Sequence, residues 1–190
     1  ITAFISYIEL EKKYSPLTVK AYKADLDNFT KFCKQDFDLA TIDKVSYSDI
    51  RSWIVYLVNN KNSNSSVNRK ISTLQSFYKF LLKTKTIRIN PLQKHRPLKK
   101  EKKIQVPFSE KEIAQVISTL EGLDDFISVR DKLMIELFYA TGMRRSELIN
   151  LKIEDLNFPE KIGHIRQAKG NKDRMFNIPE FITEALGYQV

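Results

Sequence analysis

The spacing of apolar residues changes along the chain, from a helical period over most of its length to a strand period near its end. Over 67–82 the apolar side chains recur every three or four residues, which is the pattern of a helix that packs on one face. Over 162–168 and 174–178 the pattern indicates two strands around the polar turn 169–173. The sequence therefore predicts a mainly α fold with a small β-hairpin sheet.

Helix-start signals divide the first half of the sequence into four helices. Ser15 and Pro16 supply an N-cap and a first-turn proline for the second helix. Ser46 and Asp49 form a capping-box pair for the third. The fourth is the helix over 67–82. We expect Trp53 and Tyr78 to be core aromatics of this bundle, because both lie among apolar neighbours.

Two domains joined by a basic linker are expected. Asn90 and Pro91 stop the helical pattern, and residues 93–107 combine little apolar content with two prolines, six basic residues and one acid. We therefore assign residues 1–92 to a helical domain, 93–107 to the linker, and 108–190 to a second, α+β domain.

The positive charge is concentrated in the first half. Residues 1–108 carry 21 basic and 9 acidic side chains, whereas residues 109–190 carry 11 and 14. Between Asp49 and Glu101 there is no acid at all. A positive field this one-sided predicts a polyanionic partner.

The fourth helix carries a basic and hydroxylated stripe opposite its apolar face. Lys and Arg attract phosphate charge and Ser donates hydrogen bonds to phosphate oxygens, so this stripe is a candidate DNA-binding surface. A solvated helix face is the alternative interpretation. Together with the basic linker, the candidate DNA contacts are Arg69, Ser72, Ser76, Lys79, Lys83, Lys99, Lys100, Lys102 and Lys103.

Composition excludes several other classes of function. The single cysteine, Cys33, cannot form an internal disulfide and is expected to be a small buried hydrophobe. Two histidines and one cysteine cannot form a zinc-finger ligand set, and no glycine-rich nucleotide-binding loop occurs. The longest apolar run, Trp53–Val58, is far short of a membrane span. We therefore expect a soluble protein with no metal, no cofactor and no membrane partner.

Two motifs in the second half resemble those of one enzyme family. The stretch 140–151, Ala-Thr-Gly-Met-Arg-Arg-Ser-Glu-Leu-Ile-Asn-Leu, followed by Asp155-Leu156, resembles the first conserved box of the tyrosine recombinases, most closely the bacterial Xer type. The turn 168–174, Ala-Lys-Gly-Asn-Lys-Asp-Arg, resembles that family's K-G-x-K-x-R turn. Residues 15–26 and 68–78 are similar to the core-binding domain of Xer recombinases.

The resemblance implies a SAM-like four-helix domain and the first part of a mixed catalytic domain, which together form a clamp on duplex DNA. It implies strand cleavage and rejoining through a 3′-phosphotyrosine intermediate. Arg144 is then the candidate that stabilises negative charge on the phosphate, because a guanidinium donates two hydrogen bonds to its oxygens. Lys169 is the candidate general acid for the departing 5′ oxygen. Glu147, three residues after Arg144, is the candidate supporting residue.

The family's later motifs are not found in this sequence. No His-x-x-Arg follows Lys169, and Tyr188 lacks the sequence context of a nucleophile. We therefore expect this chain to be a fragment of a site-specific DNA recombinase that binds DNA without cleaving it. The alternative is a non-catalytic DNA-binding protein that occupies recombination sites. A third hypothesis is a helical module whose basic stripe meets an acidic protein.

Further expectations concern partners and location. Double-stranded DNA is the expected partner, and the resemblance implies a second recombinase subunit in a synaptic tetramer. The lone cysteine and the bacterial Xer resemblance together indicate a cytoplasmic protein of the bacterial nucleoid. Neither His95 nor His164 has a matched partner in the sequence, so neither is expected to be catalytic.

Overall fold

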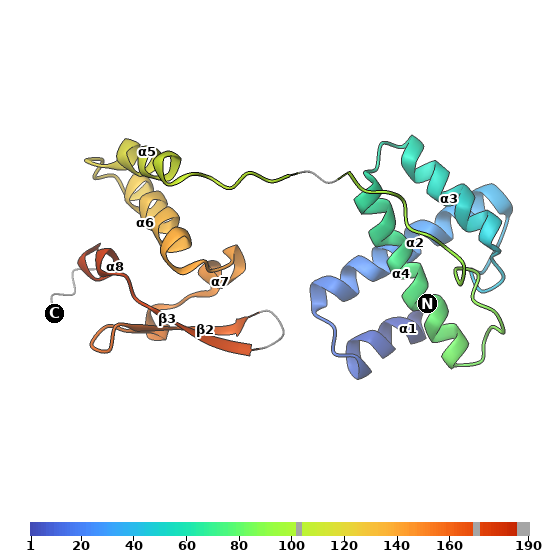
Figure 1. Cartoon of the computed structure of the whole chain (residues 1–190). Coiled ribbons are helices and arrows are strands. Elements are labelled where there is room, and N and C mark those ends of the chain that lie inside the picture. The colour runs from blue at the N-terminus through green and yellow to red at the C-terminus, as the bar shows by residue number, and fades with distance from the viewer. Residues whose placement is uncertain (102–103, 169–171, 186–190) are drawn as a thin grey trace. The chain divides into compact units, whose positions relative to one another are not determined.

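The chain forms two compact units in a computed structural model, Ile1–Ile104 and Gln105–Val190 (Figure 1). The structure describes residues 1–101, 104–168 and 172–185.

The N-terminal unit is a helical bundle, as the apolar period predicts. Its elements are α1 (Thr2–Ser6), a π-helical continuation η1 (Tyr7–Glu11), α2 (Pro16–Phe37), α3 (Tyr47–Asn59) and α4 (Asn64–Lys83). The first expected helix thus changes its hydrogen bonding midway, and the Lys12 N–H bonds to the Tyr7 carbonyl five residues back, at 3.0 Å.

The predicted caps start the helices where the sequence placed them. The Ser15 hydroxyl accepts the Thr18 N–H at the start of α2, with Pro16 as the first helical residue. At the start of α3, Ser46 and Asp49 cap each other reciprocally. These contacts lie within four residues, so the local sequence is sufficient to determine them.

The core of the N-terminal unit is one continuous apolar cluster contributed by all of its helices. Trp53, Tyr78 and Cys33 are each fully buried, which confirms the three predicted core positions. The Tyr78 hydroxyl donates to the Ile42 carbonyl at 2.8 Å, so the loop between α2 and α3 is tied to the inner face of α4.

A buried carboxylate joins α2 to α4. Asp25, with a side chain 3% exposed, accepts both Nη atoms of Arg69 at 2.7 and 2.8 Å. It also accepts the Lys70 ammonium at 3.2 Å and the Thr73 hydroxyl at 2.9 Å. Every one of these donors lies on α4, so a single acid holds the first half of that helix against α2.

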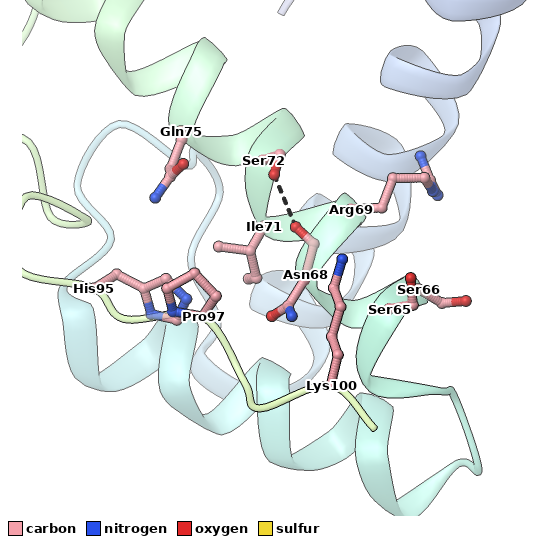
Figure 2. Close-up of a pocket in the computed structure, with 10 residues that line it drawn as sticks. All are labelled: Ser65, Ser66, Asn68, Arg69, Ile71, Ser72, Gln75, His95, Pro97 and Lys100. Atoms are coloured by element: carbon pink, nitrogen blue, oxygen red, sulfur yellow. Dashed lines mark hydrogen bonds between the residues drawn. The ribbon is translucent and has the colours of Figure 1, made fainter. Parts of the chain in front are cut away.

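The first part of the predicted linker, 93–107, lies against the N-terminal unit. The Asn68 side chain donates to the Leu98 carbonyl at 2.9 Å and accepts the Leu98 N–H at 2.9 Å. Asn64 donates to the Lys99 carbonyl at 2.8 Å. The chain therefore leaves α4 only after residue 99 (Figure 2), whereas the sequence predicts a linker from residue 93. The low apolar content of the segment gives no indication of these contacts.

The C-terminal unit combines helices with a three-stranded antiparallel sheet. Its elements are α5 (Glu110–Leu120), α6 (Phe126–Thr141), α7 (Arg145–Asn150), the 3₁₀ turn η2 (Ile153–Asp155), β1 (Leu156–Asn157), β2 (Ile162–Ala168), β3 (Lys172–Asn177) and α8 (Glu180–Ala185). The strand order is β1-β2-β3, with Ile165 opposite Arg174. The predicted hairpin is confirmed, and β1 is an additional strand.

Packing in the C-terminal unit is sparse around its first two helices. Two small clusters bury Met143 with Ile165, and Phe158 with Ile178 and Ile182. Within α5 and α6, however, no residue is buried. Among the helices of the described residues, none has the length and apolar character that crossing a bilayer needs.

Substitution of Asp25 tests how much the α2–α4 tie stabilises the N-terminal unit. Asp25→Asn should lower the free energy of unfolding by about 2 to 4 kcal/mol, because the largely buried Lys70 ammonium loses its counter-charge. Arg69 contributes less to this loss, since half of its side chain is exposed to water. Urea unfolding followed by Trp53 fluorescence reports this unit alone, since it holds the only tryptophan.

Asp27→Asn is the matched control, because Asp27 lies on the same helix and is exposed. It should change the midpoint of unfolding little. Equal midpoints for the two variants would contradict the structural role assigned to Asp25.

Candidate active site

A left-handed turn places Arg144 at the start of α7. Helix α6 ends at Thr141, and Gly142 follows with φ of 59°, a conformation that glycine adopts without strain. Met143 is buried beneath the turn, and Arg144 then takes an extended backbone conformation as the N-cap of α7. The turn thus places the Met143 side chain in the core and the Arg144 side chain at the surface, where it is 55% exposed.

Glu147 holds Arg144 through both the backbone and the side chain. Its Oε2 accepts the Arg144 backbone N–H at 2.9 Å, and its Oε1 accepts Arg144 Nη1 at 2.6 Å. The predicted support of Arg144 by Glu147 corresponds to these two contacts. A guanidinium bonded in this way has fewer accessible rotamers and presents its remaining N–H groups in a fixed direction.

A second arginine reaches the same carboxylate from the sheet. Arg174 lies on β3, and its Nη2 donates to Glu147 Oε2 at 2.7 Å. Its Nε is buried and has no hydrogen-bond partner among the residues that the structure describes. In the sequence, Arg174 is the last residue of the turn motif 168–174, and the motif alone assigns it no role. Its position in that motif was the signal that pointed to it.

The environment of Glu147 keeps its carboxylate ionised. The Arg144 backbone N–H and then the Arg174 guanidinium lower the pKa of Glu147 to about 2, against an opposing effect of burial. With a side chain only 4% exposed, Glu147 compensates one of two nearby positive charges. The pair of arginines therefore retains an excess positive charge at the surface, which suits an anionic ligand.

A second buried acid supports the sheet next to this site. Asp155 is 6% exposed in its side chain, pairs with Arg166 Nε at 2.6 Å, and accepts the Lys152 backbone N–H at 3.1 Å. Asp155 thereby joins η2 to β2, the strand that pairs with the one carrying Arg174.

The structure brings Arg144, Glu147 and Arg174 together but does not place every predicted residue. Lys169, the candidate general acid, and Tyr188 lie outside the described residues, as do Lys102 and Lys103. Among the described residues, no group of three or more His, Cys, Asp or Glu side chains is arranged to hold a metal ion.

The predicted DNA-contacting stripe of α4 is partly engaged within the protein. Ser72 and Lys79 are exposed, and the Ser72 and Ser76 hydroxyls donate to carbonyls four residues back. Lys83 lies 4.9 Å from the centre of the Tyr7 ring. Arg69 donates both Nη atoms to Asp25, although half of its side chain is exposed. Lys99 and Lys100 are exposed on the segment that follows.

The low pKa of Glu147 predicts a specific loss of stability in acid. Because folding lowers this pKa from 4.5 to about 2, the carboxylate stabilises the unit fully above pH 4.5, and the stabilisation is lost as the pH falls towards 2. Glu147→Gln should therefore be less stable than the parent at pH 7 and should approach it at low pH. Urea unfolding followed by the NMR methyl signals of Met143 and Ile165 measures this difference.

Glu121→Gln serves as the control for loss of one carboxylate from an exposed position of the same unit. The free energy of unfolding of Glu121→Gln should differ little from that of the parent between pH 7 and pH 2. A gap between Glu147→Gln and the parent that stayed constant from pH 7 to pH 2 would refute the assignment.

Two family profiles match the chain, one over each unit. The phage integrase N-terminal SAM-like domain matches residues 1–85, and the phage integrase family matches residues 108–189. Tyrosine recombinase XerC of Anoxybacillus flavithermus is 37% identical over 186 residues, which are 98% of this chain and 61% of that protein. XerC of Staphylococcus epidermidis is 36% identical, over 96% of this chain and 60% of that protein. The chain thus spans about three fifths of the length of these relatives.

Solved structures share the fold at lower identity. XerH site-specific recombinase bound to palindromic difH substrate aligns with a TM-score of 0.67 and 18% identity, over 90% of this chain and 51% of that one. The Tn1549 transposon integrase in complex with circular intermediate DNA aligns with a TM-score of 0.66 and 20% identity, over 97% of this chain and 62% of that one.

The mainly helical fold with a small antiparallel sheet agrees with these neighbours, as the sequence predicts. With a family profile on each unit and XerC relatives along nearly its whole length, the chain belongs to the tyrosine recombinase, or phage integrase, family.

Proposed function

We propose that the protein is a site-specific DNA recombinase that cleaves and rejoins DNA through a 3′-phosphotyrosine intermediate. The observation that carries this proposal is the buried Glu147 carboxylate, which accepts hydrogen bonds from Arg144 and Arg174 and leaves both guanidinium groups partly exposed. Two oriented guanidinium groups with surplus positive charge match a phosphate whose negative charge increases during the reaction.

The proposed chemistry assigns one task to each group. When a tyrosine hydroxyl oxygen loses its proton to water and attacks the phosphorus, the bond from phosphorus to the 5′ oxygen breaks, and negative charge accumulates on the two nonbridging oxygens. Arg144 donates hydrogen bonds to these oxygens, while Glu147 positions it. Lys169 gives the departing 5′ oxygen its proton as general acid. No tyrosine of this chain is assigned as the nucleophile.

The N-terminal unit supplies the proposed grip on duplex DNA. We assign residues 1–92 to a SAM-like core-binding domain, 93–107 to a basic linker whose residues 98 and 99 are bonded to that domain, and 108–190 to part of the catalytic domain. The proposed phosphate contacts come from the exposed residues of α4 and the segment after it, with Arg69 contributing only the face that it turns away from Asp25. A synaptic tetramer and a cytoplasmic, nucleoid-associated location belong to the same proposal.

Substitutions in the natural full-length protein test the catalytic assignment. Arg144→Ala should abolish formation of the covalent protein–DNA adduct on a suicide substrate and leave duplex affinity within about twofold, because the additional negative charge that Arg144 stabilises develops only in the transition state. Arg145→Ala is the matched control, since Arg145 is the exposed neighbour. Equal adduct yields for the two variants would exclude the role proposed for Arg144. The chain of residues 1–190 should bind the same duplex without forming the adduct.

Salt dependence tests the proposed DNA contact of the N-terminal unit. Affinity of the chain for duplex DNA should fall steeply between about 50 and 200 mM salt, because each neutralised phosphate releases counterions. Lys79→Ala combined with Lys83→Ala should weaken binding similarly for all sequences and flatten the salt slope by about 2. Fluorescence anisotropy measures both effects. An affinity that is independent of salt would favour an acidic protein partner instead.

A further inference from the structure

Arg174 contacts the Glu147 carboxylate, yet it has no task in the proposed reaction. It lies on β3 opposite Ile165, whose side chain is buried, and its own side chain is 37% exposed. Helix α7, which begins directly after Arg144, packs against β2, the strand next to β3 (Figure 1). The 2.7 Å bond from Arg174 to Glu147 therefore joins the sheet to the start of α7.

The inner edge of the Arg174 guanidinium faces the protein. Its Nη2 donates to Glu147, and Nε, on the same edge, is buried without a hydrogen-bond partner among the described residues. Arg144 is oriented differently, because 55% of its side chain is exposed and its bond to Glu147 comes from Nη1. Bidentate binding of a phosphate needs two adjacent N–H groups. Arg144 keeps its Nε and Nη2 edge available for such binding, whereas the same edge of Arg174 is turned inward.

Arg174 and Arg144 share one oxygen of Glu147. Oε2 accepts both the Arg144 backbone N–H, at 2.9 Å, and Arg174 Nη2, at 2.7 Å, while Oε1 accepts Arg144 Nη1. The bonds to Arg144 lie within one helix start, but the bond from Arg174 comes from a strand 27 residues later. It fixes the carboxylate relative to the sheet. Because Glu147 is held from both sides, the Arg144 guanidinium bonded to it has fewer accessible rotamers.

The same ion pair orients the stem of the hairpin. Arg174 is opposite Ile165, and Ala168, the last residue of β2, pairs with the first residue of β3. Met143 packs against Ile165, but an apolar contact has no preferred direction. The hydrogen-bonded ion pair supplies that direction. In the sequence Lys169 follows Ala168, so this contact ties the strand that leads to Lys169 to the helix start.

We propose that Arg174 is a positioning residue for strand cleavage, which acts through Glu147 to hold the Arg144 guanidinium towards the scissile phosphate. The inference rests on the proposed function and gives a task to a residue that this function leaves without one. Arg174 contributes its charge at a distance and makes no contact with the phosphate. Because the carboxylate is fixed from the sheet, Arg144 needs little reorganisation when negative charge develops on the nonbridging oxygens.

The rate of covalent adduct formation on a suicide substrate, measured in the natural full-length protein at saturating concentration, tests this assignment. Arg174→Met keeps the length of the side chain but removes its donors and its charge, and it should slow adduct formation by roughly 10- to 100-fold. Duplex affinity should stay within about twofold. Arg166→Met is the matched control and should keep the parent rate, because Arg166 lies on the same sheet and pairs with the buried carboxylate of Asp155 instead.

A double variant distinguishes positioning from direct contact. If Arg174 acts through Glu147, then Arg174→Met should slow the reaction little further in the Glu147→Gln background. An arginine that touched the phosphate would cause its full loss of rate in that background as well. Arg174→Lys restores the charge and a donor without the planar fork, so it should recover part of the parent rate.

The pKa of Glu147 gives a readout that does not depend on catalysis. The Arg144 backbone N–H and then the Arg174 guanidinium lower this pKa to about 2. In the chain of residues 1–190, Arg174→Met should raise it by about 1 to 2, because a nearby positive charge is lost. Arg166→Met should leave it unchanged. A carboxyl-carbon NMR titration measures the pKa, and the methyl signals of Ile165 verify that each variant is folded.

Two results would overturn the inference. One is a parent-like adduct rate for Arg174→Met while Arg144→Ala abolishes the adduct, which would leave the proposed function intact. The other is an undiminished effect of Arg174→Met in the Glu147→Gln background, which would make Arg174 a direct phosphate contact. If Arg174→Met does not fold, Arg174→Lys decides both questions, because it should slow the reaction by about threefold or more in the parent alone. Adduct formation by Arg144→Ala would instead count against the proposed function itself.

Discussion

In each compact unit, one buried carboxylate holds two basic side chains. Asp25 joins Arg69 and Lys70, and Glu147 joins Arg144 and Arg174. One negative charge shared by two positive charges leaves an uncompensated charge at the surface, while the hydrogen bonds fix where that charge lies. The rest of the proposed DNA chemistry depends on this arrangement, because a phosphate is stabilised most by donors that need no reorganisation.

The helix starts could be predicted from the sequence because their causes are local. Ser46 caps α3 through contacts within three residues, and Gly142 ends α6 by its own backbone conformation. The support of Arg144 by Glu147 is equally local, since three residues on a helix start bring the two together. The sequence alone could not show Arg174 in the same cluster, because that contact depends on the hairpin register and spans 27 residues.

The same distinction explains what sequence reasoning missed in the N-terminal unit. The positive stripe of α4 was visible as a pattern of residue types, but the pairing of Arg69 with Asp25 joins residues 44 positions apart. The attachment of residues 98 and 99 depends on two asparagine amides, and asparagine in a helix carries no sequence signal for such a contact. Charge patterns therefore identified the surface, and tertiary contacts determine which of its side chains are free.

The most direct test of the shared-carboxylate arrangement is NMR of the arginine side chains at neutral pH. A guanidinium held by a buried carboxylate rotates slowly about its Nε–Cζ bond, so Arg144 and Arg174 should both give resolved Nη signals in the parent chain. Both sets of signals should collapse together in Glu147→Gln. Free rotation of either guanidinium in the parent chain, or a collapse confined to one of them, would contradict the account.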